Sequence, residues 1–143
     1  MLPTAQAEGK EREKEMKTGL ILEGGAMRGM FSAGVMDVMM ENGICFDGII
    51  GVSAGAAFGV NYKSGQIGRA IRYNAKYCRD KRYCGVGSLL KTGNLFNTEF
   101  CYGEVPLKLD AFDFDTYEKD PTAFYVTCTD IESGKPVYHE YTG

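Results

Sequence analysis

Apolar and polar positions alternate along the first part of the chain in blocks that predict strands and helices in turn. Residues 18–23 (TGLILE) are a short apolar run followed by glycines, which is typical of a buried strand. Residues 30–42 are apolar on nearly all sides and are followed by Gly43, a favoured C-cap residue. They therefore predict a helix that is buried on more than one side. A second short strand is expected at residues 46–50.

The middle of the chain continues with helices and one stretch rich in turn-forming residues. Residues 54–63 predict a helix that ends at Gly65, and residues 66–78 predict the next helix. Residues 80–96 contain four Gly or Asn residues and are expected to be irregular. A short helix is expected at residues 97–107.

The last part of the chain predicts a β-hairpin. Residues 122–129 (TAFYVTCT) are rich in β-branched and aromatic residues, and residues 137–141 form a second such run. A turn with Gly134 and Pro136 separates them. The order of strands and helices predicts an α/β fold with a parallel centre.

Length and composition fit one folded domain. The chain has 143 residues, of which 44% are hydrophobic, so it can bury a core and wholesale disorder is excluded. We divide it into a charged N-terminal arm at residues 1–17 and a folded portion at residues 18–143. The arm lacks the apolar segment of a signal peptide, and no run is long and apolar enough to span a membrane. A cytoplasmic location is expected, and peripheral contact with a membrane is left open.

Charge and residue counts exclude several classes of function. The formal net charge is -3, so the excess of Lys and Arg that nucleic-acid binding requires is absent. The five cysteines show no C-x-x-C spacing, which favours reduced thiols over a disulfide framework or a zinc site. The single histidine, His139, excludes a histidine-rich metal site.

The first chemical motif is Gly51-Val52-Ser53-Ala54-Gly55, which matches G-x-S-x-G. The bare string is common, but here a predicted strand precedes it and a predicted helix follows, as a nucleophile elbow requires. The two glycines relieve crowding in the sharp turn and let the Ser53 hydroxyl project at the strand end. The N-terminus of the following helix then points amides toward that hydroxyl. The alternative is a plain glycine-rich strand-to-helix turn.

The second motif is the glycine-rich loop 24–29, Gly-Gly-Ala-Met-Arg-Gly, which follows the first strand. Carboxyl ends of neighbouring parallel strands meet at one edge, so this loop and the elbow should open toward the same crevice. Backbone amides of the loop can receive the oxyanion of an acyl-transfer intermediate. Arg28 either adds positive charge there or pairs with a carboxylate.

Two other uses of the glycine-rich loop are excluded by its sequence. It lacks the Lys-Ser/Thr pair of a phosphate-binding P-loop. Ala26 stands where a dinucleotide-binding loop has its middle glycine, and no ribose-binding acid follows at about 20 residues.

Three stretches of the chain resemble the patatin-like phospholipases, and more narrowly their bacterial patatin-like esterase branch. They are EGGAMRGMFSAGVMDVMMENGICFDGIIGVSAGA, RYCGVGSLLKTGNLFNTEF and FYVTCTDIESGKPVY. The resemblance covers about residues 18 to 141. It implies a three-layer α/β/α fold with a parallel central sheet, cut short at its C-terminus, so that residues 18–143 are the N-terminal portion of the catalytic domain.

The resemblance also implies roles for individual residues. Ser53 falls on the nucleophile, and Gly24, Gly25 and Ala26 fall on the oxyanion hole. Ala26 replaces a glycine that the family normally has, and its methyl group narrows the hole. Five further residues support the loop and the elbow: Arg28, Gly29, Gly51, Ala54 and Gly55.

The family uses a Ser-Asp dyad whose aspartate lies in an Asp-Gly-Gly/Ala motif far beyond the elbow. The only Asp-Gly pair of this chain begins at Asp47, six residues before Ser53 at the opposite end of the same predicted strand. We therefore expect the dyad aspartate to be missing from this chain. Glu23 and Asp130 follow predicted strands and are weaker candidates for a base, as is His139 in the hairpin.

The function that the resemblance implies is hydrolysis of lipid acyl esters by a serine nucleophile, without a metal or organic cofactor. The expected partner is a lipid or ester substrate. Three alternatives remain open: an α/β-hydrolase with a full triad, an acyltransferase of a related serine fold, and a non-catalytic lipid-binding fragment. The acceptor of the acyl group, the chain length and the head group cannot be read from the residues.

Overall fold

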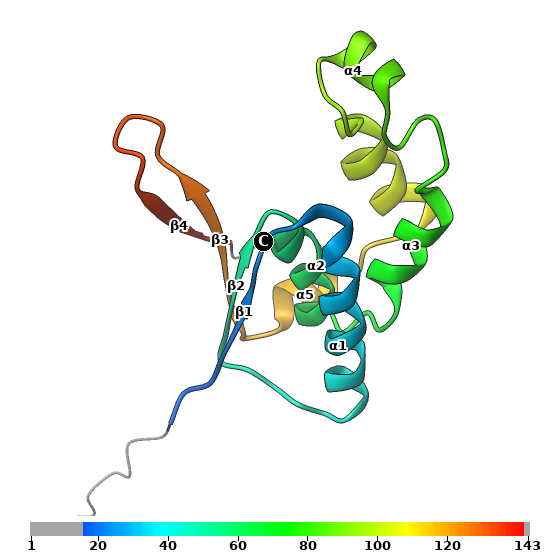
Figure 1. Cartoon of the computed structure of the whole chain (residues 1–143). Coiled ribbons are helices and arrows are strands. Elements are labelled where there is room, and N and C mark those ends of the chain that lie inside the picture. The colour runs from blue at the N-terminus through cyan, green and yellow to red at the C-terminus, as the bar shows by residue number, and fades with distance from the viewer. Residues whose placement is uncertain (1–15, 142–143) are drawn as a thin grey trace, which may run out of the picture.

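The computed structural model describes residues 16–141, which fold around a four-stranded sheet with the order β1-β2-β3-β4 (Figure 1). The strands are β1 (Gly19–Leu22), β2 (Gly48–Val52), β3 (Ala123–Thr129) and β4 (Pro136–Glu140). The first three are parallel, and β4 returns antiparallel to β3 as a hairpin. The predicted α/β fold with a parallel centre is thus confirmed. Residues 1–15 of the predicted arm lie outside the described residues.

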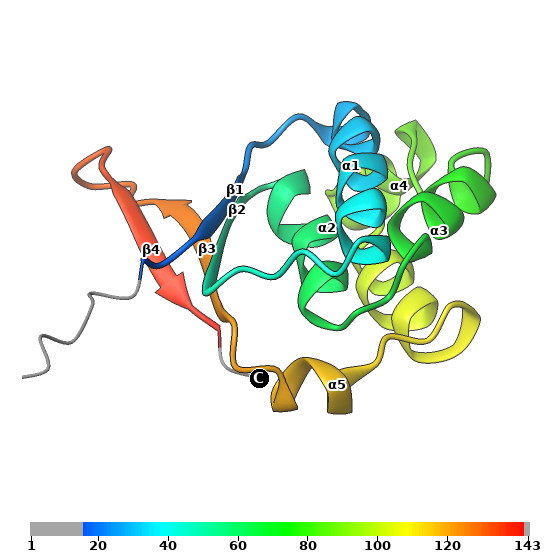
Figure 2. The same cartoon turned by 90° about the horizontal axis from the view of Figure 1, so that it is seen from below.

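The helices of the described residues lie on one side of the sheet (Figures 1 and 2). Residues 16–141 therefore form two of the three layers that the resemblance implies. The helical elements are the short 3-10 helix η1 (Ala26–Arg28), α1 (Gly29–Glu41), α2 (Ala54–Lys63), α3 (Arg69–Tyr77), α4 (Val86–Thr92), the π-helix η2 (Glu99–Leu109) and α5 (Phe114–Lys119).

Most predicted elements are found within a few residues of their expected bounds, and three regions differ. The stretch 80–96, predicted to be irregular, contains α4. The helix expected at 97–107 is the π-helix η2, which runs across Pro106, a residue without the N–H that a regular α-helical bond needs. Helix α5 was not predicted at all. Its N-cap is Asp113, whose carboxylate accepts a hydrogen bond from the Thr116 amide at 2.9 Å.

The core lies between the sheet and helices α1 and α2. Ile49 of β2 and Phe124 of β3 are almost fully buried and pack with Leu22, Met36 and other apolar residues of that cluster. The expectation that α1 is buried on more than one side is not met among the described residues. Phe31 is 81% exposed, because the described helices cover α1 on one side only.

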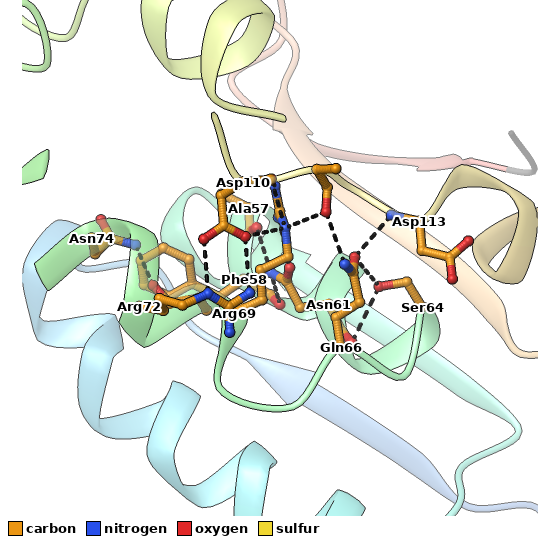
Figure 3. Close-up of polar contacts among 12 residues, drawn as sticks. Ala57, Phe58, Asn61, Ser64, Gln66, Arg69, Arg72, Asn74, Asp110 and Asp113 are labelled. Atoms are coloured by element: carbon orange, nitrogen blue, oxygen red, sulfur yellow. Dashed lines mark hydrogen bonds and ion pairs between the residues drawn. The ribbon is translucent and has the colours of Figure 1, made fainter. Parts of the chain in front are cut away.

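A buried arginine fixes the segment between η2 and α5 against α2 and α3 (Figure 3). Arg69 is 4% exposed. Its guanidinium donates to Asn61 Oδ1 at 2.8 Å and to the Asp110 carbonyl oxygen at 2.6 Å. Gln66 donates to the Ala111 carbonyl oxygen at 3.0 Å. Burial lowers the pKa of Arg69 below its ordinary value, and the nearby Asp110 carboxylate opposes that shift. This network holds one wall of the large cavity described below.

A search of the described residues for membrane-spanning helices finds none of sufficient length and hydrophobicity.

Candidate active site

Ser53 is the single residue between β2, which ends at Val52, and α2, which begins at Ala54. Its backbone has φ 51° and ψ −117°. Among the described residues, only Ser53 and Ala26 combine a side chain with a positive φ. Such a conformation costs on the order of 1–3 kcal/mol and is concentrated at functional sites. The backbone is thus strained at one residue of the glycine-rich loop, Ala26, and at one residue of the elbow, Ser53.

Close packing explains why glycines flank Ser53. A β-carbon at Gly51 would lie 2.5 Å from the Ala56 Cα, inside the backbone of α2. A β-carbon at Gly55 would overlap the carbonyl oxygen of Leu22 at the end of β1. Both glycines are therefore required by the approach of α2 to β1 and β2, as a nucleophile elbow needs.

The glycine-rich loop lies directly against the elbow, as the parallel pairing of β1 and β2 predicts. A β-carbon at Gly24 would lie 3.2 Å from the Ser53 Cβ. Gly25 has φ 150°, a conformation that residues with side chains rarely adopt. Among the described residues, no hydrogen bond uses the amides of Gly24, Gly25 or Ala26 as donors. These three amides of the loop beside Ser53 therefore have no hydrogen-bond partner among the described residues.

Helix α1 brings its N-terminus against that of α2. A β-carbon at Gly29 would lie 2.8 Å from the Phe58 ring and 3.2 Å from the Ala54 Cβ, so the two helices touch there. The Arg28 guanidinium folds over Gly25, with its Nε 3.3 Å from the position of a β-carbon on that glycine. Arg28 takes part in no ion pair of the described residues. The Arg28 charge beside the glycine-rich loop and the N-terminus of α2, which begins directly after Ser53, therefore favour an anionic group at this end of the sheet.

Ser53 is exposed and lines two cavities at once. The larger has a volume of about 670 Å³ and a mostly apolar lining that includes Ala57, Val60, Tyr73, Val105, Phe112 and Phe124. The smaller has a volume of about 220 Å³ and runs past the glycine-rich loop, with Ala26, Met27, Tyr83 and Phe96 in its lining. The hydroxyl of Ser53 is thus accessible from a polar loop on one side and an apolar cavity on the other.

Sequence reasoning missed the residues that form these cavities, because they come from distant segments of the chain. Thr127 is one example. It is the register partner of Val52 in the β2–β3 ladder and lines the larger cavity. Its Oγ1 is buried without a hydrogen-bond partner among the described residues. Its position inside a β-rich run gave no sign in the sequence that it would line the cavity.

The carboxylates next to the strand ends either accept hydrogen bonds from residues other than Ser53 or are exposed. Asp47 accepts hydrogen bonds from the Thr18 amide at 2.6 Å and its hydroxyl at 3.2 Å, at the opposite end of β2. The backbone bond from Thr18 lowers the pKa of Asp47. Asp130 accepts from the Ser133 hydroxyl at 2.7 Å, which holds its pKa below the usual range. Glu23 is exposed.

No hydrogen bond links Ser53 to a carboxylate in the part of the chain that the structure describes. His139 is exposed on β4, opposite Val126. Within residues 16–141, no three side chains of His, Cys, Asp or Glu gather as they would around a metal ion.

Comparison with known proteins agrees with this geometry. A model of the patatin-like phospholipase family matches residues 20–140, which include the glycine-rich loop, the elbow and the hairpin. Searches of curated proteins and of solved structures give no significant match. The family match spans most of the 143 residues. The chain therefore belongs to the patatin-like phospholipase family, which indicates a lipid substrate and acyl hydrolase activity.

Proposed function

We propose that the protein is a serine acyl hydrolase of the phospholipase A or esterase type, with Ser53 as its nucleophile. The observation that carries this proposal is the strained backbone of Ser53 between a loop of free amides and an apolar cavity. A plain strand-to-helix turn needs neither the strain nor the neighbouring loop. The combination matches what acyl transfer requires, which is a projecting hydroxyl beside donors for an oxyanion.

In the proposed reaction, the Ser53 Oγ attacks the carbonyl carbon of an acyl ester and loses its proton to a general base. The carbonyl oxygen becomes an oxyanion, which the amides of Gly24, Gly25 and Ala26 bind. The ester bond then breaks, the alcohol leaves with a proton, and the acyl group remains on Ser53. Water attacks this acyl-enzyme and releases the fatty acid.

The larger cavity is the proposed site of the acyl chain. Its lining is mostly apolar and opens at Ser53, so a hydrocarbon chain bound there would place its ester carbon beside the hydroxyl. Arg69 donates to the Asp110 and Ala111 carbonyl oxygens and so holds the backbone next to Phe112, which forms part of the cavity wall. Burial raises the pKa of Tyr117, another lining residue, to about 12, so its hydroxyl stays protonated at neutral pH.

In this proposal the general base is the aspartate of the family's Asp-Gly-Gly/Ala motif, and that motif does not occur in the 143 residues. Two observations support this choice. Ser53 has no carboxylate partner among the described residues, and Asp130 is committed to its own turn. A non-catalytic lipid-binding protein is the second candidate, favoured by the same lack of a neighbouring base.

Hydrolysis of a short-chain p-nitrophenyl ester tests the proposal. Because the aspartate of the proposed dyad is not among the 143 residues, we expect slow turnover by the wild-type protein, above the rate of the uncatalysed reaction, and loss of that turnover in Ser53→Ala. Ser133→Ala is the matched control, because Ser133 lies in the hairpin turn and should leave the rate unchanged. Equal rates for Ser53→Ala and wild type would refute the proposal that Ser53 is the nucleophile. Lipid binding without any turnover would favour the non-catalytic candidate.

A further inference from the structure

Helix α4 and the loop that follows it expose apolar side chains and bury a polar one. We call residues 85–95 the α4 tip. Leu90 is 82% exposed and Val86 69% exposed, whereas Ser88 of the same helix is 6% exposed. Leu95 on the return loop is exposed as well. A helix on the surface of a water-soluble domain normally shows the opposite arrangement.

Internal hydrogen bonds hold the α4 tip in this arrangement. The Ser88 hydroxyl donates to the Asn94 carbonyl oxygen at 2.8 Å, and the Thr92 hydroxyl donates to the Ser88 carbonyl oxygen at 2.9 Å. The Gly85 amide donates to the Leu95 carbonyl oxygen at 3.0 Å, which closes the base of the tip. The polar groups are thus satisfied inside the tip, and its apolar side chains are the part presented outward.

The α4 tip stands next to the proposed active site. Figure 1 shows α4 projecting at the end of the molecule where β1 and β2 reach their carboxyl ends. Tyr83 and Phe96 flank the tip and line the smaller cavity together with Ser53 and Ala26. A surface that received the tip would therefore lie beside the opening that leads to Ser53.

Basic side chains occur in the α4 tip and in the segment before it. Residues 79–98 contain four basic residues and one acidic residue, in a chain whose net charge is -3. Arg82 pairs with that acid, Asp80, at 2.9 Å and also with Glu104 at 3.3 Å. The other three basic residues, Arg79, Lys81 and Lys91, take part in none of the ion pairs of the described residues. The α4 tip and the segment before it thus carry three positive charges that have no ion-pair partner among the described residues.

We propose that the α4 tip inserts its apolar side chains into the surface of a membrane that contains anionic lipids. Exposed leucine and valine beside lysine and arginine are the chemistry that such an interface binds. A symmetric contact with a second copy fits less well, because it would bring like charges together. The inference rests on the proposed function in one respect, which is that the inserted tip seats the opening to Ser53 on its lipid substrate.

Fluorescence of an introduced tryptophan tests insertion directly, because the chain has no tryptophan of its own. Leu90→Trp places a probe in the tip, and Ile131→Trp places one at a residue that is 97% exposed in the hairpin turn. With vesicles of phosphatidylcholine and phosphatidylglycerol, we expect a blue shift of the emission for Leu90→Trp alone. No shift for Leu90→Trp, or the same shift for both variants, would overturn the proposal.

Sedimentation with the same vesicles gives an independent measure. We expect Leu90→Glu to reduce the bound fraction at least about tenfold, because a charge replaces the apolar side chain that inserts into the membrane. Ile131→Glu should bind like the wild type, and pure phosphatidylcholine should bind less of every variant. Unchanged binding by Leu90→Glu, or an oligomer that Leu90→Glu dissociates without vesicle binding by the wild type, would overturn the proposal.

Ser53→Ala separates this proposal from the catalytic one. We expect it to bind vesicles as the wild type does, because Ser53 lies beneath the opening and outside the tip. Failure of the catalytic proposal would appear as turnover retained in Ser53→Ala, with vesicle binding unaffected. Failure of the membrane proposal would appear as absent or tip-independent binding, whatever the turnover.

Discussion

Ser53 and Ala26 adopt backbone conformations that are energetically unfavourable for residues with a side chain. Their φ angles are 51° and 47°, and each lies in one of the two loops that meet at the site. The surrounding packing imposes these conformations, because α2 presses on both strands beside Ser53. At the scale of the residue, stability is given up where a hydroxyl and free amides have to be presented.

The first prediction concerns the strain at Ser53. Ser53→Gly relieves a positive φ that costs on the order of 1–3 kcal/mol, against about 0.5–1 kcal/mol for the added freedom of glycine in the unfolded chain. We expect Ser53→Gly to be more stable than Ser53→Ala by about 1 kcal/mol. Urea unfolding of the two variants measures the difference. A glycine variant less stable than the alanine variant would mean that the turn is unstrained.

The second prediction concerns the glycine-rich loop. Gly25→Val places a branched side chain at φ 150° beside the free amides, and we expect kcat to fall by roughly 10² to 10³. Ala26→Gly is the control, since it keeps the amide and relieves a positive φ, and it should retain turnover. The measurement is p-nitrophenyl ester hydrolysis by variants whose circular dichroism matches the wild type. Normal turnover by a folded Gly25→Val protein would remove the loop from the mechanism.

The glycines of the two motifs could be recognised in the sequence because close backbone contacts exclude other residue types there. Gly51 and Gly55 mark a backbone approach that no side chain fits, and that requirement leaves a readable motif. Thr127 and Tyr73 reach the cavity only through long-range packing of β3 and α3, and a local pattern contains no record of it. The motif therefore predicted the position of the nucleophile but not the shape of its binding site.

At the scale of elements, α2 organises the molecule. It follows Ser53, contacts β1 through Gly55, and packs Phe58 under the N-terminus of α1. Helix α2 was predicted with its observed bounds, because Gly65 ends a clear helical pattern. Helices α4 and α5 escaped prediction because they are short and their polar contacts, such as the Asp113 cap, outweigh weak periodicity.

The third prediction tests the contact between α2 and β1. Gly55→Ala forces a methyl group onto the Leu22 carbonyl oxygen, and we expect the free energy of unfolding to fall by about 3 kcal/mol or more. Gly34→Ala is the matched control within α1, where a β-carbon would meet only Ile71 at 3.8 Å. It should gain up to about 1 kcal/mol. Equal stability of the two variants in urea would contradict the packing described for α2.

The fourth prediction concerns the ion pair that ties α3 to the segment after η2. Arg72 donates to both Asp110 carboxylate oxygens, at 2.8 and 2.9 Å, and these bonds lower the pKa of Asp110. A lowered pKa means that the stabilisation is complete above the unfolded-state value of about 3.9. It is then lost as the pH falls through the folded-state pKa.

We therefore expect Asp110→Asn to lower the free energy of unfolding by about 1–2 kcal/mol at pH 7. The difference from wild type should shrink only below about pH 3.9. Asp115→Asn is the control, because its pair with Lys119 at 3.8 Å is highly exposed and should contribute little. A difference that persists unchanged in acid would show that the charge of Asp110 is not what stabilises the contact.

At the scale of the whole molecule, two layers place the site at one end of the sheet. Helices cover one side, the carboxyl ends of β1 and β2 carry the two loops, and α4 projects beyond them (Figure 1). The far side of the sheet is open among the described residues, and Ile21 is 76% exposed there. The α/β class and the parallel centre followed from element order, whereas one-sided coverage depends on tertiary contacts that no local pattern encodes.

Covalent labelling with a fluorophosphonate probe, followed by peptide mapping, tests the central claim most directly. We predict a single modified serine, Ser53, and no labelling of Ser53→Ala. Ser133→Ala should label like the wild type, because that serine only braces the hairpin turn. Undiminished labelling of Ser53→Ala, or a label mapped to another serine, would contradict the claim that Ser53 is the nucleophile.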